Sequence, residues 1–218
     1  MNRPLLRPGI ILTVTLLIAL LPAVGCREAL FTVVYLFKGT EIDADFAELK
    51  GKKVAVVCRP MVSLQYANSN VGRELAQQIS LLLQEQVPKI KMIDQRKIVK
   101  WTDENTWEEY PEVGKAMKAD MVVAVDLESF SLYLGQTLYQ GKANATVRVF
   151  DCKKNGKEVF RKSIPQCLYP PNGAIAASER TEPDFRAEFV GVLANQIARH
   201  FFSHDPYADL GQDAASLK

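Results

Sequence analysis

The sequence contains few of the residues and none of the spacings that mark common catalytic or metal sites. Among 218 residues there are only 2 His and 4 Cys, and neither a CxxC pair nor an HExxH motif occurs. The GxxxxGK[ST] phosphate loop, the GxGxxG fingerprint and the GxSxG nucleophile motif are also absent. We therefore expect a protein that is not an enzyme and that has no cofactor and no bound metal.

An excess of charge of either sign is lacking too. Lys and Arg number 27 against 25 Asp and Glu, a formal net charge of +2, which excludes a strongly basic nucleic-acid binder. The chain is 48% hydrophobic and 24% charged, which is ordinary for a globular protein. Arg3 and Arg7 are the only charged residues before Cys26, so the rest of the chain is formally neutral.

The first 25 residues have the pattern of an export signal. Arg3 and Arg7 precede an uncharged apolar run over 10–21, which Pro22 interrupts before a few small residues. Because a membrane-spanning helix needs about 20 uninterrupted apolar residues, this pattern favours a signal peptide over a permanent transmembrane helix.

The signal ends in a short motif around a cysteine. Ala23-Val24-Gly25-Cys26 resembles the lipobox of bacterial lipoproteins, and the resemblance implies cleavage before Cys26, diacylglycerol on its thiol and acylation of its new amino group. The next residue is Arg27 rather than Asp, which favours the outer membrane over the inner one. An ordinary signal with an incidental Cys, or an uncleaved anchor, is the alternative. The expected divisions are a signal peptide over 1–25, a lipid-anchored tether over 26–50, a periplasmic domain over 51–204 and a flexible tail over 205–218.

Hydrophobic periodicity predicts alternating strands and helices in the domain. The expected elements are a strand over 53–58, a helix over 71–86, a strand over 90–94, helical segments within 95–118, a strand over 121–134, a hairpin over 142–151 and 158–167, and a helix after Thr181. Residues 53–58 form a continuous β-branched run, typical of a strand buried on both faces. This order predicts an α/β (α+β) fold with a single mixed sheet of about five strands. The last helix carries an apolar stripe that should pack on the sheet, formed by Phe185, Phe189, Leu193, Ile197 and Phe201.

The remaining cysteines leave a disulfide open. Lipidation of Cys26 leaves an odd number of thiols, Cys58, Cys152 and Cys167, so at most one bridge can form. Asn155-Gly156 predicts a two-residue type I′ hairpin turn, which would place Cys152 opposite Val159 and so disfavours a bridge from Cys152 to Cys167. Three buried or half-buried thiols that act as small apolar residues are the alternative.

Four segments in this order resemble a small periplasmic domain of known families. The segments are KVAVVCRP at 53–60, IDQRKIVK at 93–100, KADMVVAVDL at 118–127 and VRVFDCKKNGKEV at 147–159. The domain is similar to one shared by curli-secretion lipoproteins, lipoprotein activators of peptidoglycan synthases and the N-terminal domain of the Tol-system translocation protein. The resemblance covers 52–203 and implies a non-enzymatic, membrane-tethered domain for envelope assembly or partner contact.

The loop after the first strand is the best candidate for a ligand site. It lies at the carboxyl end of a predicted strand and before a predicted helix, where ligands bind in open α/β sheets. Its expected polar lining is Arg59, Asn68, Ser69, Asn70 and Arg73. Helix capping by Ser69 or Asn70 would explain those two residues without any ligand.

Two other clusters contain residue types that are found in metal or catalytic sites. His200 and His204, four residues apart, are expected on one helix face beside Asp205, but no further zinc ligand is spaced to complete a site. An acidic run surrounds Trp101 and Trp107, and a solvated helix face with the tryptophans turned inward explains it better than paired catalytic carboxylates. The run comprises Asp103, Glu104, Glu108, Glu109 and Glu112.

The sequence thus predicts a lipid-anchored periplasmic domain that acts as a protein-interaction module in envelope assembly or secretion. Its expected partners are the membrane, through the lipid anchor, and an envelope protein; nucleic acid is not expected. A domain that binds or hydrolyses a small ligand in the loop after the first strand is the alternative. A subunit of a homo-oligomer is a third hypothesis.

Overall fold

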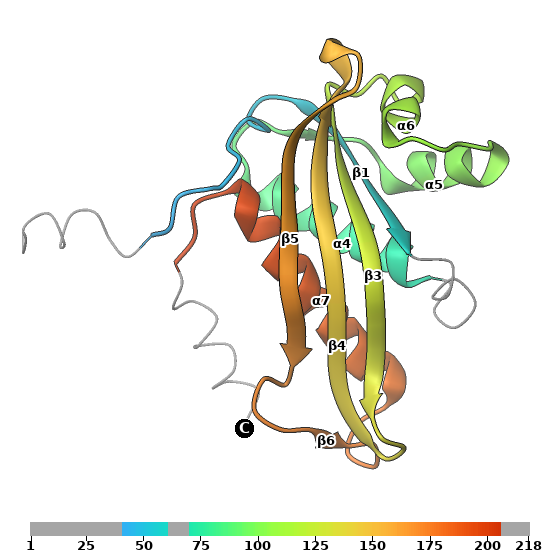
Figure 1. Ribbon diagram of the computed structural model, residues 1–218, viewed down its shortest axis with the longest axis vertical. Helices are drawn as coiled ribbons and strands as arrows, with labels where there is room; N and C mark the ends of the chain where they lie inside the picture. Colours follow the sequence, from blue (N-terminus) through green and yellow to red (C-terminus); the bar gives the residue numbers. More distant parts are fainter. Residues whose placement is uncertain (1–40, 61–69, 206–218) are drawn as a thin grey trace, which may run out of the picture. The chain divides into compact units, whose positions relative to one another are not determined.

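The computed structural model describes residues 41–60 and 70–205, and Asp43–His204 form one compact unit. The predictions for the signal peptide, for most of the tether, for Asn68 and Ser69, and for almost all of the tail lie outside the described residues. The elements are β1 (Lys53–Pro60), α4 (Val71–Gln86), β2 (Lys91–Met92), α5 (Gln95–Glu104), α6 (Tyr110–Ala116), β3 (Met121–Leu134), β4 (Leu138–Asp151), η2 (Cys152–Lys154), β5 (Lys157–Tyr169), β6 (Ile175–Ala176), α7 (Glu182–Ala198) and η3 (Arg199–Phe201) (Figure 1).

These strands form a single mixed sheet, which confirms the predicted fold class. Its order is β2-β1-β3-β4-β5, and β6 pairs with the start of β4 beyond the end of β5. Strand β1 runs parallel to both of its neighbours, β2 and β3, whereas β4 is antiparallel to both β3 and β5. Strand β3 continues past its last pairing with β1, at Leu127, so the sheet is longer on the side of the hairpins.

Helices cover both faces of the sheet, and each face has its own core. The larger core joins α4 and α7 to one face, and it contains all five residues of the predicted stripe, from Phe185 to Phe201, each no more than 2% exposed. The smaller core joins α5 and α6 to the other face through Ile98, Tyr110 and Val113. Strand β1 contributes Val54 and Val56 to the larger core and Ala55 and Val57 to the smaller one, as its continuous β-branched run predicts. Complete burial of a Phe or Leu side chain contributes about 1.5–3 kcal/mol.

The β4–β5 hairpin differs from the predicted two-residue turn. Asn155 and Gly156 do have positive φ angles of 53° and 71°, as such a turn requires, but η2 precedes them, and the last strand pair is Asp151 with Lys157. The predicted pairing of Cys152 with Val159 is therefore wrong. Because Asp151 accepts a hydrogen bond from the Lys153 N–H, the chain turns into η2 instead of continuing the ladder. Cys58, Cys152 and Cys167 are all free thiols.

Three boundaries also differ from prediction. The second strand shrinks to Lys91–Met92, because Asp94 caps α5 by accepting a hydrogen bond from the Arg96 N–H. The fourth strand begins at Leu138, and the loop over 168–181 contains β6, which pairs with β4 at Leu138 and Tyr139.

The cap of α7 is as predicted, since the Thr181 side chain accepts a hydrogen bond from the Asp184 N–H. No helix of the described residues is long and apolar enough to cross a membrane.

The start of the compact unit is fixed against the end of its last helix. The Phe46 N–H donates to the His200 carbonyl over 3.0 Å, and the Phe46 ring packs against Phe160 and Phe201. Asp45 contacts His200 Nδ1 at 2.6 Å, and Lys162 at 3.1 Å. The segment before β1 is therefore attached to β5 and η3 by both apolar and charged contacts.

Candidate functional site

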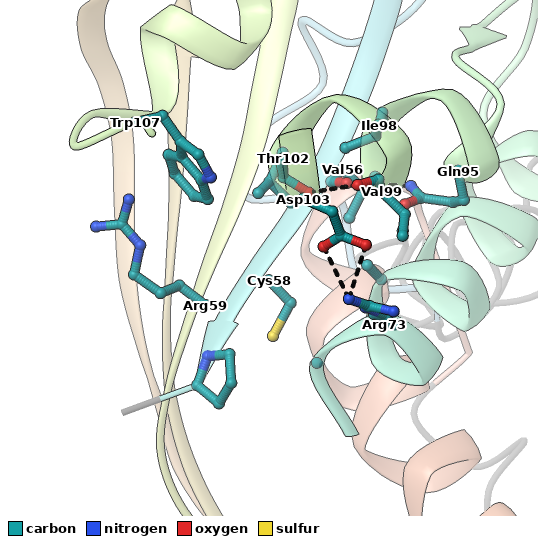
Figure 2. A pocket seen from close by; sticks show the side chains of 14 residues that line it. Val56, Cys58, Arg59, Arg73, Gln95, Ile98, Val99, Thr102, Asp103 and Trp107 are labelled. Carbon is teal, nitrogen blue, oxygen red and sulfur yellow. Dashed lines mark hydrogen bonds and ion pairs between the residues drawn. The ribbon is translucent and has the colours of Figure 1, made fainter. Parts of the chain in front are cut away.

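A crevice lies at the carboxyl end of β1, where the sequence predicts it. Its volume is about 520 Å³, within the range of small-molecule sites. Helix α4 borders it with Gly72 and Arg73, and α5 borders it with residues from Gln95 to Asp103 (Figure 2). The two helices leave to opposite faces of the sheet, so a space stays open between them where β1 ends.

Only some of the predicted residues are placed in this crevice. Arg59 and Arg73 line it from β1 and α4, whereas Asn70 lies at the N-cap position of α4 and its side chain makes no capping hydrogen bond. Ligand binding by Arg59 and Arg73 stays a prediction.

The guanidinium of Arg59 lies over an aromatic pair. Its central carbon is 4.1 Å from the centroid of the Trp107 ring and 4.9 Å from that of Tyr110, and Nη2 donates to the Glu108 carbonyl over 2.9 Å. A cation over an aromatic face contributes about 0.5–1 kcal/mol at an exposed site. Arg59 therefore ties β1 to the segment between α5 and α6.

Arg73 and Asp103 close the opposite side of the crevice. Arg73 Nη2 lies 2.8 Å and 3.0 Å from the two carboxylate oxygens of Asp103, which joins α4 to α5 (Figure 2). Both side chains are about half exposed, and such a pair contributes at most about 1 kcal/mol. Sequence reasoning placed Asp103 on a solvated face, because no local pattern reveals an ion pair between two helices.

Gln95 lines the crevice, and it was not identified from the sequence. Its side chain is buried, and its Nε2 donates to the Val56 carbonyl over 3.0 Å and to Ser80 Oγ over 2.7 Å. The Ser80 hydroxyl in turn donates to the Ala76 carbonyl over 2.7 Å. This network fixes the start of α5 against β1 and α4, and the only available signal was a Gln directly after the Asp94 cap.

Cys58 lines the crevice, but its environment disfavours the reactive thiolate form. Burial raises the pKa of its thiol far above the ordinary value, and the nearby Asp126 carboxylate raises this pKa further. Because the thiolate is the reactive form, the protonated thiol acts as a small apolar group. The described lining combines apolar side chains with the guanidinium groups of Arg59 and Arg73, which already donate to the Glu108 carbonyl and to Asp103.

A second charged cluster lies beside the crevice, over the smaller core. Asp126 accepts hydrogen bonds from the Tyr110 hydroxyl and from Arg148 Nη2, both over 2.6 Å. The Arg148 guanidinium also packs over the rings of Tyr110 and Phe150, although its buried Nε has no partner. Burial and the Asp126 hydrogen bond raise the pKa of Tyr110 well above its ordinary range. These contacts brace the smaller core.

The two histidines do not share a helix face, so that prediction is wrong. Helix α7 ends at Ala198, and η3 follows before Phe202 adopts an extended conformation. His200 Nδ1 contacts Asp45, while His204 Nδ1 lies 3.3 Å from the Phe202 carbonyl. Among the described residues no group of three or more His, Cys, Asp or Glu could hold a metal ion.

The acidic run around the tryptophans has local structural roles. Glu109 and Glu112 form a capping box at the start of α6, and the Glu109 N–H donates to Glu112 Oε1 over 3.1 Å. Trp101 and Trp107 pack against the smaller core, which agrees with the expected inward orientation.

No protein-family model matches the chain, and no curated protein matches it. Among solved structures, PelC from Paraburkholderia phytofirmans, solved as a dodecamer, is 10% identical with a TM-score of 0.45; the match covers 74% of this chain and 96% of that one. Lipoprotein GNA1162 from Neisseria meningitidis is 14% identical with a TM-score of 0.43, over 67% of this chain and 98% of that one. A minor lipoprotein from Acinetobacter baumannii is 12% identical with a TM-score of 0.35, over 70% and 92%. The solved structures similar to this chain thus include bacterial lipoproteins, and likeness at this level assigns neither a family nor a function.

Proposed function

We propose that this chain is a bacterial lipoprotein whose α/β domain faces the periplasm and acts as a non-catalytic protein-interaction module in envelope assembly or secretion. The observation that carries the proposal is the lipobox-like Ala23-Val24-Gly25-Cys26 at the end of an export signal. Two or more acyl chains on one residue give stable membrane attachment, whereas one chain does not.

The way the domain begins supports this arrangement. Asp45 and Phe46 are fixed against His200, Phe160 and Phe201, so the compact unit starts a short distance along the chain after Cys26. The residues between Cys26 and Asp43 then serve as the tether. The absence of Asp after Cys26 supports an outer-membrane location.

The test is metabolic labelling with a clickable fatty acid in a bacterial host that lipidates proteins. We expect the wild-type chain to be labelled and the Cys26→Ala chain to lose the label. Cys58→Ala is the matched control and should keep it, because Cys58 lies in the folded domain. Equal labelling of the wild type and Cys26→Ala would refute lipidation at Cys26. Density-gradient fractionation of the labelled envelope should place the protein in the outer membrane, and Arg27→Asp should move it toward the inner one.

A second candidate function is the binding of a small anion in the crevice after β1. The observation that favours it is that Arg59 and Arg73 line one cavity. The test is the thermal stability of the protein with increasing inorganic phosphate, compared with that of Arg73→Gln. A stabilisation of the wild type that Arg73→Gln abolishes would support the site, and equal stabilisation of both proteins would exclude it.

A further inference from the structure

Topology brings two uncharged segments together at one end of the sheet. Residues 129–141 and 164–178 contain no Asp, Glu, Lys or Arg. The first segment forms the β3–β4 hairpin tip, and the second runs from β5 through β6 (Figure 1). Leu138 and Tyr139 of β4 pair with Ala176 and Ile175 of β6. We call these two segments together the neutral end.

The neutral end exposes large apolar side chains. Tyr133, Leu134 and Leu138 are 37–40% exposed, and Leu134 and Leu138 face each other as a strand pair. They account for half of the large hydrophobic residues that are exposed in the described part of the chain. Depletion of charge together with a high share of apolar and aromatic surface is typical of the centre of a protein interface.

The base of the neutral end is rigidly built. The rings of Tyr133 and Tyr139 lie 5.1 Å apart between centroids, and Tyr139 stacks on the buried Phe185 at 4.9 Å. The Ala177 N–H donates to the Thr137 carbonyl over 2.9 Å, which ties the second segment to the hairpin tip. A surface that is already ordered loses little conformational entropy when it binds.

Acidic side chains border the neutral end. The hydroxyl of Tyr133 donates to Glu182, and the N–H of Glu179, three residues after β6 ends, donates to the Ala176 carbonyl over 2.9 Å. A shallow depression next to Tyr139 is lined by Glu179, Asp184 and Glu188. Its single basic residue, Arg180, forms an ion pair with Glu188, so the border keeps a negative charge.

This charge pattern selects the kind of partner. Anionic lipid headgroups would be repelled by the acidic border. Two copies of the neutral end would repel each other, because their acidic borders would come together.

The neutral end also lies far from the point where the chain enters the compact unit. At about 3.3 Å per residue, β4 spans roughly 35 Å from Val149, the strand partner of Phe160, to Leu138. Because Phe46 packs on Phe160, the described chain enters the compact unit far from the neutral end.

We infer that the neutral end docks into an apolar socket, flanked by Lys or Arg, on a periplasmic protein. This inference rests on the proposed function as an interaction module and names its contact surface. Leu134 and Leu138 would enter the socket, while Glu179 and Glu182 would pair with its basic border.

The test is site-specific photo-cross-linking of the full-length chain in intact cells. p-Benzoylphenylalanine is placed at Leu134 or Leu138, and at Leu81 as the control, because Leu81 is 49% exposed on α4. We expect both tip positions to give an adduct with the same protein and Leu81 to give none.

The second arm reverses the border charges. Glu179→Lys with Glu182→Lys should lower the adduct yield at Leu134 by about tenfold. Reversal of two exposed acids elsewhere, Glu48→Lys with Glu85→Lys, should leave the yield unchanged. Melting temperatures of both double variants show whether each still folds.

Five results would overturn the inference: phospholipid adducts, adducts with a second copy of the chain, equal adducts at Leu81, no adduct at the tip, or a yield that folded Glu179→Lys with Glu182→Lys leaves unchanged. Fatty-acid labelling tests the anchor separately. Labelling at Cys26 without a tip adduct would refute the docking surface alone, and a tip adduct without labelling would refute the anchor alone.

Discussion

Gly141 and Gly191 form a matched pair that tests the packing of α7 on the sheet. A Cβ at Gly141 would lie 2.4–2.6 Å from three ring carbons of Phe189, whereas a Cβ at Gly191 would meet nothing within 4 Å. Ordinary carbon contacts are about 3.5–4.0 Å, so Gly141→Ala requires the Phe189 ring to retreat by about 1 Å. The ring is fully buried, with Phe130 at 5.2 Å between centroids, and has little room to move.

We expect opposite signs for the two substitutions. Overpacking of a filled core costs about 1–3 kcal/mol, and Gly141→Ala should lie at the upper end of that range. Gly191→Ala, in the helix interior, should stabilise the protein by about 0.5–1 kcal/mol, because Ala has the higher helix propensity and restricts the unfolded chain.

The assay is urea unfolding followed by far-UV circular dichroism and by the fluorescence of Trp101 and Trp107, which report on the smaller core. With a slope of about 2 kcal/mol per molar urea, Gly141→Ala should lower the midpoint by about 1–1.5 M. An unfolding free energy within about 0.5 kcal/mol of the wild type would refute the described contact between β4 and α7.

Three further substitutions test the crevice network, a helix cap and an acid-sensitive ion pair. Gln95→Leu should lower the free energy of unfolding by about 1–3 kcal/mol, since the Val56 carbonyl and the Ser80 hydroxyl each lose the Gln95 donor, and Ser80→Ala should cost less, as measured by urea unfolding. Thr181→Ala should cost about 1 kcal/mol through loss of the α7 cap, whereas Thr181→Ser should keep the wild-type midpoint. Hydrogen bonds from the Lys153 side chain and the Lys53 N–H lower the pKa of Asp120, so its stabilisation is present above its unfolded pKa of about 3.9 and is lost as the pH falls below it. The melting temperature of Asp120→Asn should therefore lie below that of the wild type at pH 6 and converge with it toward pH 3; a constant difference would contradict this assignment.

The elements that the sequence predicted well are those whose burial repeats along the chain. The run over 53–58 has no polar residue between Val54 and Cys58, so only a strand covered on both faces accommodates it. The stripe from Phe185 to Phe201 recurs every four residues, and its cap at Thr181 is a local side-chain contact. Such signals depend on neighbours in sequence, which is why they were sufficient.

The sequence predictions are wrong or incomplete where the local structure depends on contacts between segments that are distant in sequence. The chain leaves the ladder at Cys152, where the Lys153 N–H donates to the Asp151 carboxylate and the Cys152 N–H donates to the Asp120 carbonyl, and Asn155-Gly156 supports turns of more than one length. The short strand β6 exists only because it pairs with β4, and its sequence has too few residues for a recognisable alternation. The crevice was predicted in position but not in its contacts, because Gln95 and Asp103 reach it from a helix that the sequence could not orient.

The crevice and the neutral end differ in whether their side chains are already paired within the chain. In the crevice, Arg73 is paired with Asp103, Arg59 lies on Trp107, and Gln95 is bonded to Val56, so a ligand would have to displace or share contacts that the chain makes itself. The neutral end offers the reverse situation, since Leu134 and Leu138 are held in place by the sheet while their apolar surface stays in water. Exposed apolar surface on a rigid base is a cost in solubility that folding does not require. A protein contact at Leu134 and Leu138 would relieve that cost without displacing a hydrogen bond of either side chain, which is why we propose an interaction module ahead of a small-ligand site.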